Sequence, residues 1–213
     1  MNSNYITYGV GFSAQILFSA RMIVQWITSE KAGRVVSPVI FWFLSLAGSF
    51  LLLIYGVFRE DLVIVAGQII LYYIYIRNLE LQKIWGRFPV FLRVILICFP
   101  MMAFLWFSFG PKSATVIRLL HPKHITSALL IWGGIGQSIF LFRFVLQWLS
   151  SERQKTSVLP LQFWIFSLIG SSMLIAYAVF RRDPVLLIGQ LFGTLIYTRN
   201  IIIHHRQIKI AAN

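Results

Sequence analysis

Hydrophobic residues occur along this chain in long runs separated by short polar segments. Seven runs are each close to the ~20 residues that an α-helix needs to cross ~30 Å of hydrocarbon. They cover Tyr5 to Thr28, Pro38 to Phe58, Leu62 to Leu79, Phe88 to Phe109, Ile125 to Leu149, Pro160 to Phe180, and Pro184 to Ile203. The pattern predicts an all-α membrane protein with seven transmembrane helices.

The runs also contain an internal repeat. A shift of 122 residues aligns Gly11 to Asn78 with Gly133 to Asn200 without a gap. Positions shared by the two copies recur every three or four residues in the first and second helices, so they lie on one face of each helix. The chain is therefore predicted to divide into a three-helix repeat over 1–80, a linker over 81–123 and a second three-helix repeat over 124–213.

The linker run, Phe88 to Phe109, has no counterpart elsewhere in the sequence. Three helices per copy is an odd number, so copies joined directly would have opposite orientations in the membrane. One extra helix gives both copies the same orientation. The predicted arrangement is 3+1+3, with parallel repeats as in SWEET-type sugar transporters.

Composition supports a membrane protein, since 58% of residues are hydrophobic and only 12% are charged. A net charge of +13 would suggest nucleic acid for a soluble protein. Here the basic residues collect in the loops, and nucleic acid is not predicted as a partner. The side with the C-terminus carries ten Lys and Arg residues against six on the other side, which favours an outside N-terminus and a cytoplasmic C-terminus.

The acidic residues give no sign of catalysis. All six lie at helix ends or in loops: Glu30, Glu60, Asp61, Glu80, Glu152 and Asp183. This placement argues against a carboxylate proton relay within the membrane. The sequence also shows no catalytic triad, phosphate-binding glycine loop or metal-ligand spacing. We therefore expect neither an enzyme nor a cofactor nor a metal site.

Two arginines interrupt the apolar runs at equivalent positions, Arg21 and Arg143. A central arginine costs about 2.5–3.5 kcal/mol on insertion scales. Snorkelling to the interface, or pairing with Glu30 and Glu152, would lower that cost. The functional alternative is a buried anion site, because the planar guanidinium binds two phosphate oxygens at once.

Further polar residues recur near the same cytoplasmic side and are candidate ligands of that anion. They are Gln25, Gln147, Tyr75, Tyr197, Arg77, Asn78, Arg199 and Asn200. Another repeated set lies deeper in the runs: Gln15, Gln68, Gln137 and Gln190. Hydrogen bonding between helices is the first interpretation of this second set, with sugar hydroxyls as the alternative. The repeated small residues Ser45, Ser167, Gly48 and Gly170 are interpreted as packing positions.

The repeated motif resembles the lipid A biosynthesis N-terminal domain. The first copy reads Arg21-x-x-x-Gln25-Trp26-x-x-Ser29-Glu30, then Pro38-x-x-Phe41-Trp42-x-x-Ser45, then Gly67-Gln68 and Tyr75-x-Arg77-Asn78. This resemblance implies membership of the wider PQ-loop and SWEET group and a role near lipid A or other lipid-linked sugars. It departs from that group because both copies lack a Pro-Gln dipeptide in the first helix.

Together these features predict a transporter or flippase in the bacterial inner membrane, with a periplasmic N-terminus. Its predicted substrate is an anionic lipid-linked sugar of the polyprenyl-phosphate aminosugar type, used to modify lipid A or surface glycans. Two alternatives remain open: a SWEET-type transporter of soluble sugars, and a non-transporting membrane partner of a lipid glycosyltransferase.

Overall fold

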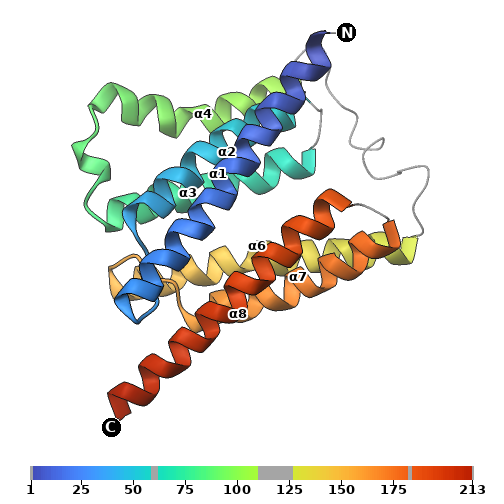
Figure 1. The fold of residues 1–213 in the computed structure, drawn as a ribbon. Coiled ribbons are helices and arrows are strands. Elements are labelled where there is room, and N and C mark those ends of the chain that lie inside the picture. Colours follow the sequence, from blue (N-terminus) through green and yellow to red (C-terminus); the bar gives the residue numbers. More distant parts are fainter. Residues whose placement is uncertain (1, 59–61, 110–126, 182–183, 213) are drawn as a thin grey trace. The chain divides into compact units, whose positions relative to one another are not determined.

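The structure is a computed structural model that describes residues 2–58, 62–109, 127–181 and 184–212. Within these ranges the chain forms seven α-helices and one short 3-10 helix (Figure 1). They are α1 (Asn2–Ala32), α2 (Val39–Phe58), α3 (Leu62–Leu81), η1 (Trp85–Arg87), α4 (Val90–Phe109), α6 (Ser127–Gln154), α7 (Leu161–Arg181) and α8 (Pro184–Ala212). Each α-helix lies on one of the seven apolar runs, so the predicted helical class is confirmed.

Several helices continue beyond the apolar runs that predicted them. The last one, α8, reaches Ala212 although the seventh run ends at Ile203. A hydropathy pattern marks the apolar part of a helix and not its polar last turns. The ends of α1 and α6 are set instead by the backbone, because Gly33 and Lys155, at equivalent positions, both adopt a positive φ near 60° (63° and 53°).

Among the described helices, three contain a segment long and apolar enough to cross a membrane. These segments are Ile6–Ala32, Val39–Phe58 and Leu161–Phe180. Helix α4 contributes a shorter apolar segment, Val90–Trp106. A membrane protein is therefore indicated, while seven spans and the 3+1+3 arrangement stay predictions.

The chain divides into two compact units. The first comprises Met1–Arg21 with Val39–Lys123, and the second Met22–Pro38 with His124–Asn213. The boundary between them thus falls inside α1.

In the first unit α2, α3 and α4 pack against one another (Figure 1). The rings of Phe50 and Phe99 stack with centroids 4.1 Å apart, and the Tyr73 hydroxyl donates to the Ile97 carbonyl at 2.9 Å. The predicted linker helix therefore packs on the first repeat. In the second unit α7 packs against both α6 and α8.

Equivalent side chains form the cores of the two copies. Phe41 and Trp42 meet edge to face at 4.8 Å, and Phe163 and Trp164 repeat this contact at 4.9 Å. Trp42 also lies 6.1 Å from Tyr75, and the counterpart distance, from Trp164 to Tyr197, is 6.2 Å. The aromatic stripe that the sequence repeats is therefore buried packing.

Repeated glycines allow the helices of each copy to approach closely. A Cβ atom at Gly48 would lie 2.9 Å from the Phe18 ring, and one at Gly170 would lie 3.0 Å from Phe140. Real Cβ contacts are rarely this short, so a side chain at either position would push the neighbouring helix away. The packing role predicted for these glycines is confirmed.

Candidate anion-binding site

The two repeated arginines lie inside the protein and not at its surface. Arg21 on α1 is 7% exposed and Arg143 on α6 is 2% exposed. Snorkelling is not their arrangement, since a snorkelling side chain would end in solvent. Each guanidinium is enclosed by residues of its own unit.

Arg21 is held by hydroxyl groups and aromatic rings. Its Nη1 donates to Ser45 Oγ at 2.9 Å and to Tyr75 Oη at 3.1 Å. The centre of the guanidinium lies 4.5 Å from the Phe18 ring and 5.3 Å from the Phe41 ring, at cation–π distance. These contacts come from α1, α2 and α3, so all three helices of the first repeat position this side chain.

Arg143 repeats the arrangement in the second copy. Its Nη1 donates to Ser167 Oγ at 2.9 Å. The guanidinium lies 3.6 Å from the Phe140 ring and 5.3 Å from the Tyr197 ring. Ser167 and Tyr197 are the counterparts of Ser45 and Tyr75, so the sequence repeat carries an equivalent polar cluster in each unit.

Ser45 and Ser167 belong to the candidate site, although the sequence indicated only a packing role for them. Each hydroxyl donates back to a carbonyl one turn earlier, to Phe41 at 2.6 Å and to Phe163 at 2.5 Å. That bond fixes the hydroxyl hydrogen and turns the oxygen lone pairs toward the arginine. Small residues that recur in a repeat are usually interpreted as packing positions. The only sequence signal for the serine–arginine hydrogen bonds is that an arginine recurs in the preceding helix of each copy.

The acidic residues that the structure describes are engaged elsewhere. Glu30 pairs with Arg199, Glu80 pairs with Arg77, and Glu152 pairs with Lys155. Glu30 and Glu152 also accept from the indoles of Trp26 and Trp148. Structural pairing of the buried arginines with Glu30 and Glu152, the other alternative from the sequence, thus loses support.

The structure places Gln25 and Asn200 in a separate polar cluster at the helix ends. Their side-chain amides bond reciprocally, with Gln25 Nε2 donating to Asn200 Oδ1 at 2.8 Å and Asn200 Nδ2 donating to Gln25 Oε1 at 3.1 Å. Gln25 Nε2 also lies 2.9 Å from Ser29 Oγ. An amide nitrogen has two hydrogens, so these acceptors use its full capacity. This pair ties the end of α1 to α8 within the second unit.

Gln147, on α6, has a similar structural role, because it holds the loop that follows this helix. It donates to Ser151 Oγ at 2.9 Å and to the Val158 carbonyl at 2.9 Å. Ser151 in turn accepts from the Val158 backbone N–H at 3.1 Å. The glutamine therefore anchors the loop that follows its helix.

The remaining predicted ligands near the helix ends also have protein partners. Arg199 binds both carboxylate oxygens of Glu30, with Nη2 to Oε2 at 2.8 Å. Arg77 bonds to Glu80 on the same helix at 2.5 Å, and Asn78 donates to the Ile74 carbonyl at 2.9 Å. The two tyrosines of this set do contact the arginines, because Tyr75 accepts from Arg21 and the Tyr197 ring lies at cation–π distance from Arg143.

The deeper glutamines separate into two kinds. Gln15 and Gln137 are on exposed faces of α1 and α6. Gln68 accepts from Ser49 at 2.8 Å, the interhelical bond that the sequence predicted. Its counterpart differs, because Ser171 pairs with Thr194 at 3.1 Å and the buried Oε1 of Gln190 has no hydrogen-bond partner among the described residues.

Each cluster can bind an anion by electrostatics and hydrogen bonding. A guanidinium has five N–H donors, and the bonds to Ser45 and Tyr75 use those of Nη1. The hydroxyls and ring faces described above orient the positive charge. Fold and site together define a helical membrane protein with two equivalent buried cationic clusters, one per repeat.

The chain belongs to the Lipid A Biosynthesis N-terminal domain family, whose model matches residues 10–80 and 132–202. The two matched segments correspond to the two sequence copies and so confirm both the repeat and the resemblance. No solved structure matches the chain.

Curated relatives are chlamydial enzymes. The chain is 30% identical over 185 residues to the lipid-A-disaccharide synthase of Chlamydia pneumoniae. The alignment covers 85% of this chain and 30% of that protein. It is 27% identical over 216 residues to the same-named protein of Chlamydia felis, covering 97% of this chain and 34% of the relative. The chain thus spans about a third of the length of these relatives. The family and the relatives together link it to lipid A biosynthesis.

Proposed function

We propose that this protein moves an anionic lipid-linked sugar, of the polyprenyl-phosphate aminosugar type, between the leaflets of the bacterial inner membrane for lipid A or surface glycan modification. The observation that carries this proposal is the pair of buried arginine clusters. Arg21 and Arg143 are desolvated, and the neighbours that the structure shows for them are neutral hydroxyls and rings. A phosphate would offset that desolvation, while the polyprenyl tail stays in lipid.

The family supports the lipid part of the substrate. The family is described as a lipid A biosynthesis domain, and the matched relatives are named for a disaccharide of lipid A. A neutral soluble sugar, the substrate of the SWEET-type alternative, cannot form the charge-assisted hydrogen bonds with two buried guanidinium groups that a phosphate forms. The proposed topology has seven spans, an outside N-terminus and a cytoplasmic C-terminus.

Native mass spectrometry of the purified protein tests ligand binding. We expect the wild-type protein to retain a phosphate-bearing lipid. Arg21→Gln or Arg143→Gln should reduce the lipid-bound fraction about tenfold or more, because hydrogen bonds between charged groups are stronger than those of a neutral amide. Arg→Lys at either site keeps the charge but loses the planar fork, so it should bind less than wild type. Arg87→Gln, a change at an exposed arginine of η1, is the matched control. Equal lipid retention in wild type and the double Gln variant would rule the proposal out.

A second function is favoured by one observation, the coverage of the relatives. The matched region is about a third of a lipid-A-disaccharide synthase, which suggests a membrane partner for a lipid glycosyltransferase. In that case the protein would raise the activity of a glycosyltransferase in the same vesicles, with Arg21→Gln and wild type acting alike. Loss of that stimulation in the Arg21→Gln variant would instead connect the effect to the anion site.

A further inference from the structure

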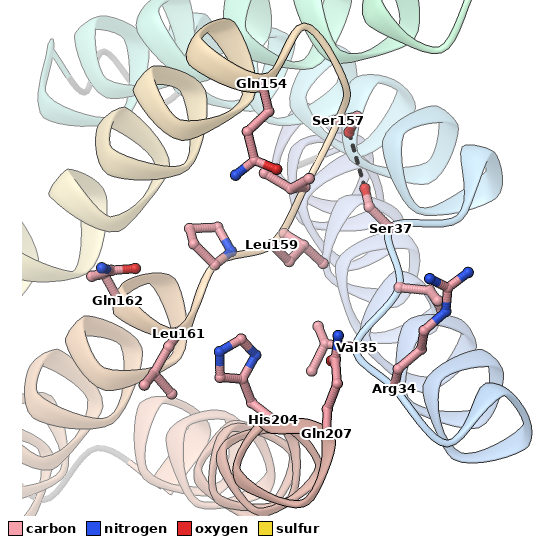
Figure 2. Close-up of a pocket in the computed structure, with 13 residues that line it drawn as sticks. Arg34, Val35, Ser37, Gln154, Ser157, Leu159, Leu161, Gln162, His204 and Gln207 are labelled. Carbon is pink, nitrogen blue, oxygen red and sulfur yellow. Dashed lines mark hydrogen bonds between the residues drawn. The ribbon is translucent and has the colours of Figure 1, made fainter. Parts of the chain in front are cut away.

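The second unit holds a polar pocket at its loops, distinct from the buried arginine clusters. Its volume is about 660 Å³, within the range of ~300–1,000 Å³ typical of small-molecule sites. We call it the loop pocket (Figure 2), because the loop after α1 and the loop after α6 form much of its wall. A hydrogen bond of 3.0 Å between the hydroxyl oxygens of Ser37 and Ser157 joins the two loops. The residues that line it are Arg34 to Ser37, Gln154, Ser157 to Gln162, His204 and Gln207.

About half of the residues that line the loop pocket have polar side chains. Figure 2 shows His204 and Gln207 rising from α8 toward the space between the loops, with Gln154 reaching toward it from the end of α6. Arg34 is exposed and supplies a full positive charge at the edge of the pocket, on the outer side of the loop after α1 in Figure 2. Among the described residues that line the pocket, none is acidic. The nearby Glu152 is paired with Lys155 at 3.5 Å. The loop pocket therefore offers a ligand one positive charge together with amide, hydroxyl and imidazole groups.

Two further features point to a ligand. The Nδ1 atom of His204 is buried and has no hydrogen-bond partner among the described residues. Burial and the neighbouring His205 lower the pKa of His204, which favours the neutral imidazole. The 21-residue helix α7 begins at the pocket wall with Leu161 and Gln162, and a helix N-terminus carries a partial positive charge.

We propose that the loop pocket binds a phosphate-bearing sugar or headgroup, with Arg34 on the phosphate and the amides of Gln154 and Gln207 on hydroxyl groups. The volume exceeds that of phosphate alone, which is why a polar group of sugar size is included. This proposal is independent of the proposed function, because it uses neither Arg21 nor Arg143. The phosphate could belong to a soluble sugar phosphate or to a lipid headgroup; both present the same chemistry.

Isothermal titration of the 213-residue chain in neutral detergent distinguishes these sources. The test compounds are glucose 1-phosphate, inorganic phosphate and glucose, and a second arm uses nanodiscs with or without phosphatidylglycerol. We expect glucose 1-phosphate to bind better than phosphate, and Arg34→Gln to weaken it about tenfold. His204→Gln should weaken it as well. If only the phosphatidylglycerol arm shows Arg34-dependent binding, the ligand is a lipid headgroup and the site stands.

Matched controls separate this site from the membrane site. Arg153→Gln removes an exposed charge near the same loop without touching the pocket lining, and it should leave binding unchanged. Arg21→Gln should also leave pocket binding unchanged, whatever it does to lipid retention. Binding that is equal in wild type, Arg34→Gln and His204→Gln would overturn the proposal, as would glucose binding as tightly as glucose 1-phosphate.

Discussion

At the scale of single residues, Ser45 and Ser167 decide how the guanidinium of each copy is oriented. Each serine hydrogen is used by the carbonyl one turn earlier, and its oxygen accepts from Arg21 or Arg143 at 2.9 Å. A buried charged donor that loses an acceptor carries a larger penalty than a neutral one. These serines should therefore matter more to stability than their size suggests.

Ser45→Ala is expected to lower the free energy of unfolding by about 1–3 kcal/mol, because it removes an acceptor from a buried guanidinium. In an Arg21→Met background the same change should cost less than about 1 kcal/mol, since no charge is left to satisfy. Chemical denaturation in detergent measures both. Ser172→Ala, at an exposed serine bonded to the Leu168 carbonyl, is the control and should have little effect. Equal costs in both backgrounds would show that the serine acts by packing alone.

The adjacent glycines of α6 offer a second test at this scale. A Cβ atom at Gly133 would lie 2.7 Å from the Tyr177 ring, whereas one at Gly134 would meet nothing within 4 Å. Gly133→Ala should destabilise the protein by about 1–3 kcal/mol through overpacking. Gly134→Ala should stabilise it by up to about 1 kcal/mol, because alanine is the better helix former. Thermal unfolding of the two variants should shift in opposite directions, and shifts of the same sign contradict this packing.

At the scale of elements, the end of α1 is tied to α8 by side chains far apart in sequence. Gln25 and Asn200 exchange amide hydrogen bonds, and Glu30 binds Arg199 beside them. Both amides are fully buried. The two amides therefore depend on each other. If one is removed, the other becomes a buried polar group that has lost its hydrogen-bond partner.

A double-mutant cycle on Gln25→Ala and Asn200→Ala measures that tie. Each single change should lower the free energy of unfolding by about 1–3 kcal/mol, and the double change by clearly less than the sum. Denaturation in detergent gives the three values. The control pair is Gln25→Ala with Gln137→Ala, whose second residue is exposed on α6 and should add independently. Strict additivity of Gln25 and Asn200 would mean that the two amides are not coupled in the folded protein.

Helix positions and the repeat were predictable from sequence, while side-chain partners were not. Apolar runs and the 122-residue shift gave all seven described helices, because hydropathy and periodicity are local properties. The pairing of Gln25 with Asn200 joins residues 175 positions apart and depends on tertiary packing. Gln190 illustrates the same limit. In the first copy Ser49 donates to Gln68, whereas the equivalent serine of the second copy, Ser171, bonds to Thr194 and not to Gln190. Equivalent sequence positions thus need not keep equivalent bonds.

At the scale of the whole molecule, orientation in the membrane follows from the distribution of basic residues. In a variant with Cys98 replaced by alanine, single cysteines introduced at 31–35 and at 111–123 should react with impermeant reagents from opposite sides of the membrane. The 31–35 sites should be labelled only after the membrane is opened, since the loops richer in Lys and Arg are predicted to be cytoplasmic. Labelling of both segments from one side would refute the seven-span topology.

Transport by the purified protein tests the central claim most directly. In proteoliposomes that contain only this protein, we expect a fluorescent polyprenyl-phosphate aminosugar to move between leaflets faster than in protein-free liposomes, as measured by quenching with an impermeant reagent. Arg87→Gln should transport like wild type, while the Arg21→Gln/Arg143→Gln variant should fall to the protein-free rate because the phosphate loses both buried guanidinium groups. Translocation by that double variant at the wild-type rate, or no translocation by the wild-type protein, would contradict the account.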